Sequence, residues 1–246
     1  MDDLVVTATR LATPRGELAS SVTVITAEEI QRRQYRSVPH ALRSVPGLHV
    51  VQTGGPGQQT SVFMRGANSN HTLVLIDGVE ASDPSSPAGA VDFSNLWLDN
   101  VERIEIVRGP QSTLYGNGNM GGTVRYITNP PSLSRVQASV RAGYSTTEGG
   151  DPGSYIDAAV SVPLVENKLG LRLVSSYQDI GGWHEIPDFE LENTNPAEIS
   201  NMRASLLWAP TDRLTLQFMY ARDRADQEGG TPVYSLDPQI AAALPG

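Results

Sequence analysis

The sequence predicts an α+β domain over residues 10–130, followed over residues 131–246 by antiparallel strands of an incomplete outer-membrane β-barrel. Three observations support this fold class. Residues 10–130 contain both helix signals and short β-branched runs, and clusters of Gly, Pro and Asn separate these segments. The second part instead has a hydrophobic period of two. There, short turns also alternate with long polar loops, as they do in outer-membrane barrels.

The first part carries two helix signals. Thr26 followed three residues later by Glu29 predicts a capped helix start, after a β-branched run at 22–25. A second helix is expected over residues 37–44, because Pro46 and Gly47 cannot continue it. Further strands are expected at residues 48–51, 61–64, 72–76, 101–107 and 123–128. The longest gap, residues 80–100, is expected to be a surface loop.

The second part is expected to contain about five strands, near residues 136–145, 156–164, 169–178, 203–208 and 214–221. In the third of these, Leu171 and Leu173 are expected to face outward while Arg172 and Ser176 face inward. Tyrosines are expected at the long-loop ends of three strands, at Tyr144, Tyr177 and Tyr220. Periodicity alone fits an ordinary antiparallel sheet with one wet face equally well.

Composition excludes several classes of function. The 246 residues carry a net charge of −9, which argues against nucleic acid as the main partner. The absence of Cys excludes disulfides, zinc–thiolate sites and thiol catalysis. No stretch approaches the ~18 apolar residues of a spanning helix. No signal peptide precedes the first motif, so an exported protein would be present here in mature or trimmed form.

Catalytic and metal sites find no support in the sequence. No nucleophile elbow or paired catalytic carboxylates occur, so we predict that the protein is not an enzyme. The histidines show no metal-ligand spacing, and we assign no metal to His40, His49, His71 and His184. Four acids are expected in a loop outside the cell, where solvated charge is favoured over a Ca²⁺ site: Asp223, Asp226, Glu228 and Asp237.

Four segments in order resemble the start of a TonB-dependent outer-membrane receptor, with a plug domain and the first barrel strands. The segments are residues 2–9 (a TonB box), 62–66 with 72–79 (the central plug signature), 101–110 (the second signature) and 114–128 (the exit into the barrel). The resemblance implies three divisions: a TonB-box-like segment at 1–9, a plug at 10–130 and truncated barrel strands at 131–246.

The N-terminal segment has the character of an extended peptide that adds to a partner's sheet edge. The resemblance implies that this partner is the periplasmic domain of TonB. The residues expected to bind it are Asp3, Leu4, Val5, Val6, Thr7 and Ala8. The alternative is an ordinary first strand of the plug sheet.

Two arginines precede glycines at strand ends, Arg65 and Arg108, and two acids, Glu102 and Glu105, lie near the second of them. The resemblance implies that such plug arginines pair with barrel carboxylates and hold the plug in the lumen, since a guanidinium bridges carboxylates with fixed geometry. The alternative is Arg–Glu pairing within the plug.

The resemblance implies TonB-dependent uptake of a scarce metal chelate, an iron–siderophore or cobalamin, across the Gram-negative outer membrane. Short segments of the plug sequence resemble the vitamin B12 branch of the family most. Expected partners are TonB, outer-membrane lipid and the chelate, with no resident cofactor. Candidate substrate contacts are Thr53, Gln58, Gln59, Asn68, Asn70 and Asp83. The rival functions are a passive plugged channel and a surface-binding module without TonB coupling. Five strands leave open edges in lipid, so we expect an N-terminal part of a larger protein.

Overall fold

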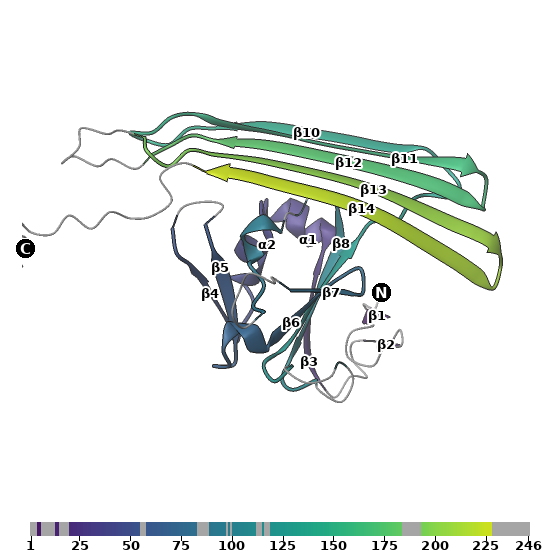
Figure 1. Cartoon of the computed structure of the whole chain (residues 1–246), viewed down its shortest axis with the longest axis horizontal. Coiled ribbons are helices and arrows are strands. Elements are labelled where there is room, and N and C mark those ends of the chain that lie inside the picture. Colours follow the sequence, from purple (N-terminus) through teal and green to yellow (C-terminus); the bar gives the residue numbers. More distant parts are fainter. Residues whose placement is uncertain are drawn as a thin grey trace, which may run out of the picture.

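The structure, a computed structural model, describes residues 4–5, 13–14, 20–54, 58–82, 89–96, 98, 100–111, 115, 119–183 and 193–227. An α+β domain, which we call the plug (residues 20–128), lies against one face of a long five-stranded sheet, which we call the wall (Figure 1). No helix in the described part of the chain is long and apolar enough to cross a membrane.

The main sheet of the plug has the strand order β3-β8-β9-β6-β7. Its neighbours are antiparallel except for the parallel pair of β6 and β9. Its strands are β3 (Ser21–Thr26), β6 (Thr72–Ile76), β7 (Val79–Ala81), β8 (Val101–Arg108) and β9 (Gly122–Thr128). Two further antiparallel pairs are β4 (Leu48–Gln52) with β5 (Thr60–Met64), and β1 (Leu4–Val5) with β2 (Thr13–Pro14).

Two short helices lie between the plug sheet and the wall (Figure 1): α1 (Ala27–Arg32) and α2 (Val38–Leu42). The predicted cap of α1 is confirmed, because the Glu29 amide donates to Thr26 Oγ1 at 3.2 Å. The second helix is shorter than predicted, although Gly47 with φ +82° does turn the chain soon after it. One face of α2 packs into the plug core, with Val38, Ala41 and Leu42 fully buried.

The expected surface loop at residues 80–100 is in part wrong. Strand β7 occupies its beginning, and the 3₁₀ turn η3 (Phe93–Asn95) lies near its end. Phe93 and Leu98 are buried in the core cluster of the plug. Isolated apolar residues among prolines and serines carry no periodicity, which is why the sequence pattern did not reveal that this stretch packs inward.

The wall is an antiparallel meander in chain order from β10 to β14. Its strands are β10 (Gln137–Ser145), β11 (Gly153–Val165), β12 (Leu169–Ile180), β13 (Ala197–Thr211) and β14 (Leu214–Gln227). Tight turns join β11 to β12 and β13 to β14 at one end, whereas longer connections lie at the other end. The predicted number of strands is therefore confirmed, and β11 to β14 are longer than the sequence indicated.

The two faces of the wall differ as the period of two predicted. On β12, Arg172, Val174 and Ser176 are buried against the plug, whereas Leu173 and Tyr177 are exposed. Large apolar side chains point away from the plug on every strand, among them Val140, Ile156, Leu173, Met202, Trp208, Phe218 and Tyr220. A wall that is apolar outside and polar inside is the arrangement of an outer-membrane barrel.

The end of β14 corrects two expectations. Asp223 and Asp226 lie in this strand and not in a loop, because β14 continues to Gln227. For the same reason Tyr220 lies in the middle of its strand, whereas Tyr144 and Tyr177 do lie near the long-loop ends of theirs. Residues 221–226 contain four charged residues and only two alanines, so no apolar period of two revealed the continuation of the strand. Glu228 and Asp237 lie outside the described residues.

Candidate functional site

The interface between the plug and the wall is the candidate site, and Asp77 is its central carboxylate. Asp77 follows β6 in a tight Asp-Gly turn, with φ +50° at Asp77 and +88° at Gly78. Its Oδ1 accepts from the Thr128 amide and its Oδ2 accepts from Thr128 Oγ1, both at 2.8 Å. Arg203 on β13 donates to the same Oδ2 at 3.3 Å. One carboxylate thus joins two plug strands to the wall.

A second bond between the plug and the wall is buried more deeply. Arg172 on β12 donates from Nε to Asn100 Oδ1 at 2.7 Å, and only 9% of Arg172 and 3% of Asn100 is exposed. The Asn100 carbonyl also accepts from the Asn129 amide at 2.9 Å. The guanidinium has therefore left water for a neutral amide partner, so loss of that partner would leave a buried charge unsatisfied.

The linker from the plug to β10 is fastened to the wall as well. The Ser132 amide donates to Ser161 Oγ at 2.7 Å, and the Asn167 amide donates to the Leu133 carbonyl at 2.8 Å. Gly170 allows this close passage, because a Cβ there would lie 2.6 Å from the Ser132 carbonyl oxygen.

Arg65 and Arg108, the two arginines expected to lock the plug, lie beside each other at the C-terminal end of β8. Arg108 donates to the Pro46 carbonyl at 2.6 Å and to Thr23 Oγ1 at 2.9 Å. The Arg65 guanidinium lies next to Gly109, since Nη1 would be 3.1 Å from a Cβ there. Both expected acids instead contact Arg103, which donates from Nε to Glu105 at 2.8 Å and from Nη1 to Glu102. Glu105 is fully buried.

The candidate substrate contacts do not form one cluster. Thr53, Gln58 and Gln59 lie at the tip of the β4–β5 hairpin, where the Thr53 amide donates to the Gln59 carbonyl at 3.0 Å. Gln58 also donates to Gln227 at 2.7 Å, which places this tip at the long-loop end of the wall. Asn68 and Asn70 lie beyond the opposite end of β5, and Asp83 lies outside the described residues.

The expected TonB-binding residues mostly lie outside the described residues: Asp3, Val6, Thr7 and Ala8. Only the backbone of Leu4–Val5 is described, and it pairs with Thr13–Pro14. The described residues contain no group of three or more His, Asp or Glu that could hold a metal ion.

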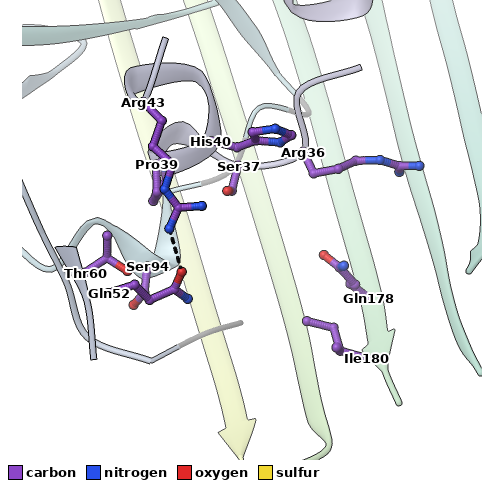
Figure 2. A pocket seen from close by; sticks show the side chains of 10 residues that line it. All are labelled: Arg36, Ser37, Pro39, His40, Arg43, Gln52, Thr60, Ser94, Gln178 and Ile180. Atoms are coloured by element: carbon purple, nitrogen blue, oxygen red, sulfur yellow. Dashed lines mark hydrogen bonds between the residues drawn. The ribbon is translucent and has the colours of Figure 1, made fainter. Parts of the chain in front are cut away.

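Two of the cavities that the described residues form lie between the plug and the wall. One, of about 270 Å³, lies between α1 and the strands β10–β12 and contains the inward ion pair of Arg141 with Asp157, at 2.7 Å. The other, of about 280 Å³, separates α2, the β4–β5 hairpin and η3 from the end of β12. Figure 2 shows Arg36, His40 and Arg43 on the plug side of this second cavity, and Gln178 on the wall strand opposite.

The bonds that Asp77 and Asn100 form with the wall involve residues that sequence reasoning did not single out as a site. Arg172 is the large charged member of an inward set otherwise made of Gly, Val, Ser and Gln, and this was the available signal. Asp77 stood within a recognised signature, but its partner Arg203 is 126 residues away in the chain, and no sequence spacing indicates the pair.

Comparison with known proteins identifies the plug. Residues 14–123 match the family described as TonB-dependent Receptor Plug Domain. The siderophore receptor PirA from Acinetobacter baumannii is similar in structure, with 22% identity and a TM-score of 0.67 over 84% of this chain and 32% of that one. The ferric yersiniabactin uptake receptor FyuA from Yersinia pestis gives 22% identity and a TM-score of 0.69 over the same shares.

The ferripyoverdine receptor of the outer membrane of Pseudomonas aeruginosa is also similar, with 21% identity and a TM-score of 0.72 over 91% of this chain and 27% of that one. The chain thus spans about a third of the length of the solved receptors it matches. Residues 14–123 thus match the plug domain of TonB-dependent receptors, and five antiparallel strands follow this plug with the fold that the solved outer-membrane receptors share.

Proposed function

We propose that this chain belongs to a receptor that imports an iron–siderophore chelate across the outer membrane by coupling to TonB. The observation that carries the proposal is the bonding of the plug to the wall, through Asp77 with Arg203 and Asn100 with Arg172. A plug held by these bonds cannot leave the lumen without work. The outer membrane has no nucleotide supply, so the work has to arrive through a partner.

The chelate assignment draws on the solved neighbours, which include a siderophore receptor and receptors named for ferric yersiniabactin and ferripyoverdine. A plugged receptor suits such ligands because they are bulky and scarce. Thr53, Gln58 and Gln59 are proposed to contact the chelate, since the hairpin tip lies at the long-loop end. Asp3–Ala8 is proposed as the segment that TonB captures after the chelate binds.

The wall requires further strands to work as a barrel. Within the described residues, β10 and β14 each have only one neighbouring strand, so each leaves an edge of unpaired backbone groups. In lipid every unsatisfied backbone group costs several kcal/mol. We propose that additional strands complete the cylinder around the plug, and the experiments below therefore use the complete receptor that contains this chain.

Growth on a sole iron source tests the proposed function. The complete receptor is expressed in a Gram-negative host that has TonB but lacks its own siderophore and cobalamin receptors. Ferric chelates are supplied in turn as the sole iron source, and cobalamin is supplied separately as the sole corrinoid under conditions that require it. Growth on a ferric chelate is expected, and it is expected to disappear when residues 3–8 are deleted. A deletion that leaves uptake unchanged would favour a passive channel, and binding without uptake would favour a surface module.

Crosslinking tests the coupling step itself. This chain has no Cys, so Val6→Cys introduces a unique thiol within it. Disulfide formation with a Cys in the periplasmic domain of TonB is expected to increase when the chelate is added. Val79→Cys, on an exposed plug strand, is the matched control and is expected to give no chelate-dependent crosslink. Equal crosslinking with and without chelate would contradict the coupling.

A further inference from the structure

We propose that the cavity between α2 and the end of β12 binds one anionic arm, a carboxylate or catecholate, of the chelate as it passes between plug and wall. This inference rests on the proposed function and specifies the charge of its substrate. The cavity volume of about 280 Å³ lies below the usual range of whole-ligand pockets, about 300–1,000 Å³, which is why we assign it one arm and not a complete chelate.

The charge of the cavity is the first argument. Arg36, His40 and Arg43 line it, and among the described residues no Asp or Glu does. Neither arginine forms an ion pair within the described part of the chain. Arg36 lies over the Tyr155 ring, 3.8 Å from its centroid, and Arg43 donates to Gln52 Oε1 at 3.0 Å. A guanidinium has five N–H donors, so both arginines retain donors for a carboxylate or phenolate oxygen.

An unpartnered hydroxyl is the second and independent argument. Ser94 lines the same cavity and is 5% exposed, yet its Oγ has no hydrogen-bond partner among the described residues. A buried hydroxyl without a partner is unfavourable and rare in folded proteins. An anionic oxygen in the cavity would accept a hydrogen bond from Ser94 Oγ.

Asp92, two residues before Ser94, forms no ion pair with either arginine among the described residues. Asp92 Oδ1 accepts from the Ser94 amide at 2.9 Å and from the Thr60 amide at 2.8 Å. These two bonds hold η3 against the β4–β5 hairpin and fix the position of Ser94. Asp92 therefore acts as a support behind the cavity, and the cavity itself presents donors.

The position of the cavity fits a passing substrate. Gln178 and Ile180 line its far side and lie at the long-loop end of β12 (Figure 2). The hairpin tip, where Gln58 bonds to Gln227, lies at the same end of the wall. A chelate that enters between the long loops thus meets this cavity at the seam between plug and wall.

Two ferric chelates of similar size but different charge provide the test. The probes are a trianionic ferric tris-catecholate and a neutral ferric trihydroxamate, each measured for binding to the purified complete receptor and for uptake. The double variant Arg36→Gln with Arg43→Gln is expected to bind the tris-catecholate at least about tenfold more weakly, since each charge-assisted hydrogen bond corresponds to about tenfold or more in affinity. Binding of the trihydroxamate is expected to change less than about twofold.

Matched variants separate a ligand role from a structural one. Arg32→Gln removes an exposed plug arginine outside the cavity and is expected to change neither affinity. Ser94→Ala is expected to weaken tris-catecholate binding about threefold or more without lowering the thermal stability of the receptor. Unchanged tris-catecholate binding in the double variant, or equal loss for both chelates, would overturn the subsite.

The two proposals fail in different ways. If the wild-type receptor takes up neither ferric chelate, both the proposed function and the anionic subsite are refuted. A wild-type receptor that takes up only the neutral chelate, in a TonB-dependent manner, retains the proposed function and overturns the anionic subsite.

Discussion

Removal of the Asp77 carboxylate is expected to lower the free energy of plug unfolding. The structure divides this loss between the ion pair with Arg203 and the two hydrogen bonds from Thr128. At the 3.3 Å separation of Arg203 Nη1 and Asp77 Oδ2, the gross Coulomb attraction is about 5 kcal/mol at an effective dielectric constant of about 20. Desolvation and side-chain ordering oppose most of it, so about 1–2 kcal/mol is expected to remain for this half-buried pair. The two bonds from Thr128 add about 1.5 kcal/mol each.

Asp77→Asn is therefore expected to lower the free energy of plug unfolding by about 1–2 kcal/mol, because an amide can still bond to Thr128. Asp77→Ala is expected to lower it by about 4 kcal/mol, because both bonds from Thr128 and the ion pair are lost. The assay is urea unfolding of the purified complete receptor, with protease cleavage within the plug as the signal. The double-mutant cycle of Asp77→Asn with Arg203→Gln is expected to give a coupling of about 1–2 kcal/mol.

The exposed ion pair of Arg224 with Asp226 on the wall is the matched control, with a coupling expected below about 0.5 kcal/mol. If Asp77→Asn and Arg203→Gln add to within about 0.3 kcal/mol, this ion pair does not hold the plug and the reasoning is refuted.

Three further predictions concern stability and insertion. Gly170→Ala is expected to cost about 1–3 kcal/mol, because its Cβ would press on the Ser132 carbonyl, and a displaced linker should make residues 129–136 cleavable by protease. Thr26→Ala is expected to destabilise the plug by about 1 kcal/mol in urea unfolding, with Thr26→Ser close to wild type. Val140→Arg on the outward face is expected to impair membrane insertion by about 2–4 kcal/mol if it lies near the bilayer midplane, and Ser139→Arg on the inward face much less, as measured by the folded fraction in lipid vesicles. Equal folding of the two arginine variants would contradict the assignment of the faces.

The sequence predicted the elements that depend on local chemistry. Thr26 caps α1 because the hydroxyl and the amide three residues later meet in any helix that starts there. The inward face of β12 followed from a strict period of two, and four ordered signatures identified the plug. Each of these signals lies within a few residues of the structure that it specifies.

Features that depend on long-range contacts could not be predicted. Asp77 meets Arg203 only because the turn after β6 lies against β13, and neither residue type nor spacing indicates that pairing. Phe93 and Leu98 pack into the core although their segment has no periodicity. The candidate contacts at Asn68 and Asn70 are separated from Thr53 because β5 lies between them, which becomes visible only once the hairpin is formed.

The linker at Ser132 and Leu133 ties one end of the plug to the wall. Its partners, Ser161 in β11 and Asn167 in the turn between β11 and β12, follow it in the chain, so these two bonds form only after that hairpin is in place. We therefore expect the final docking of the plug to depend on the folding of the wall. We also expect a force applied at the N-terminus to displace the opposite end of the plug before it displaces this linker.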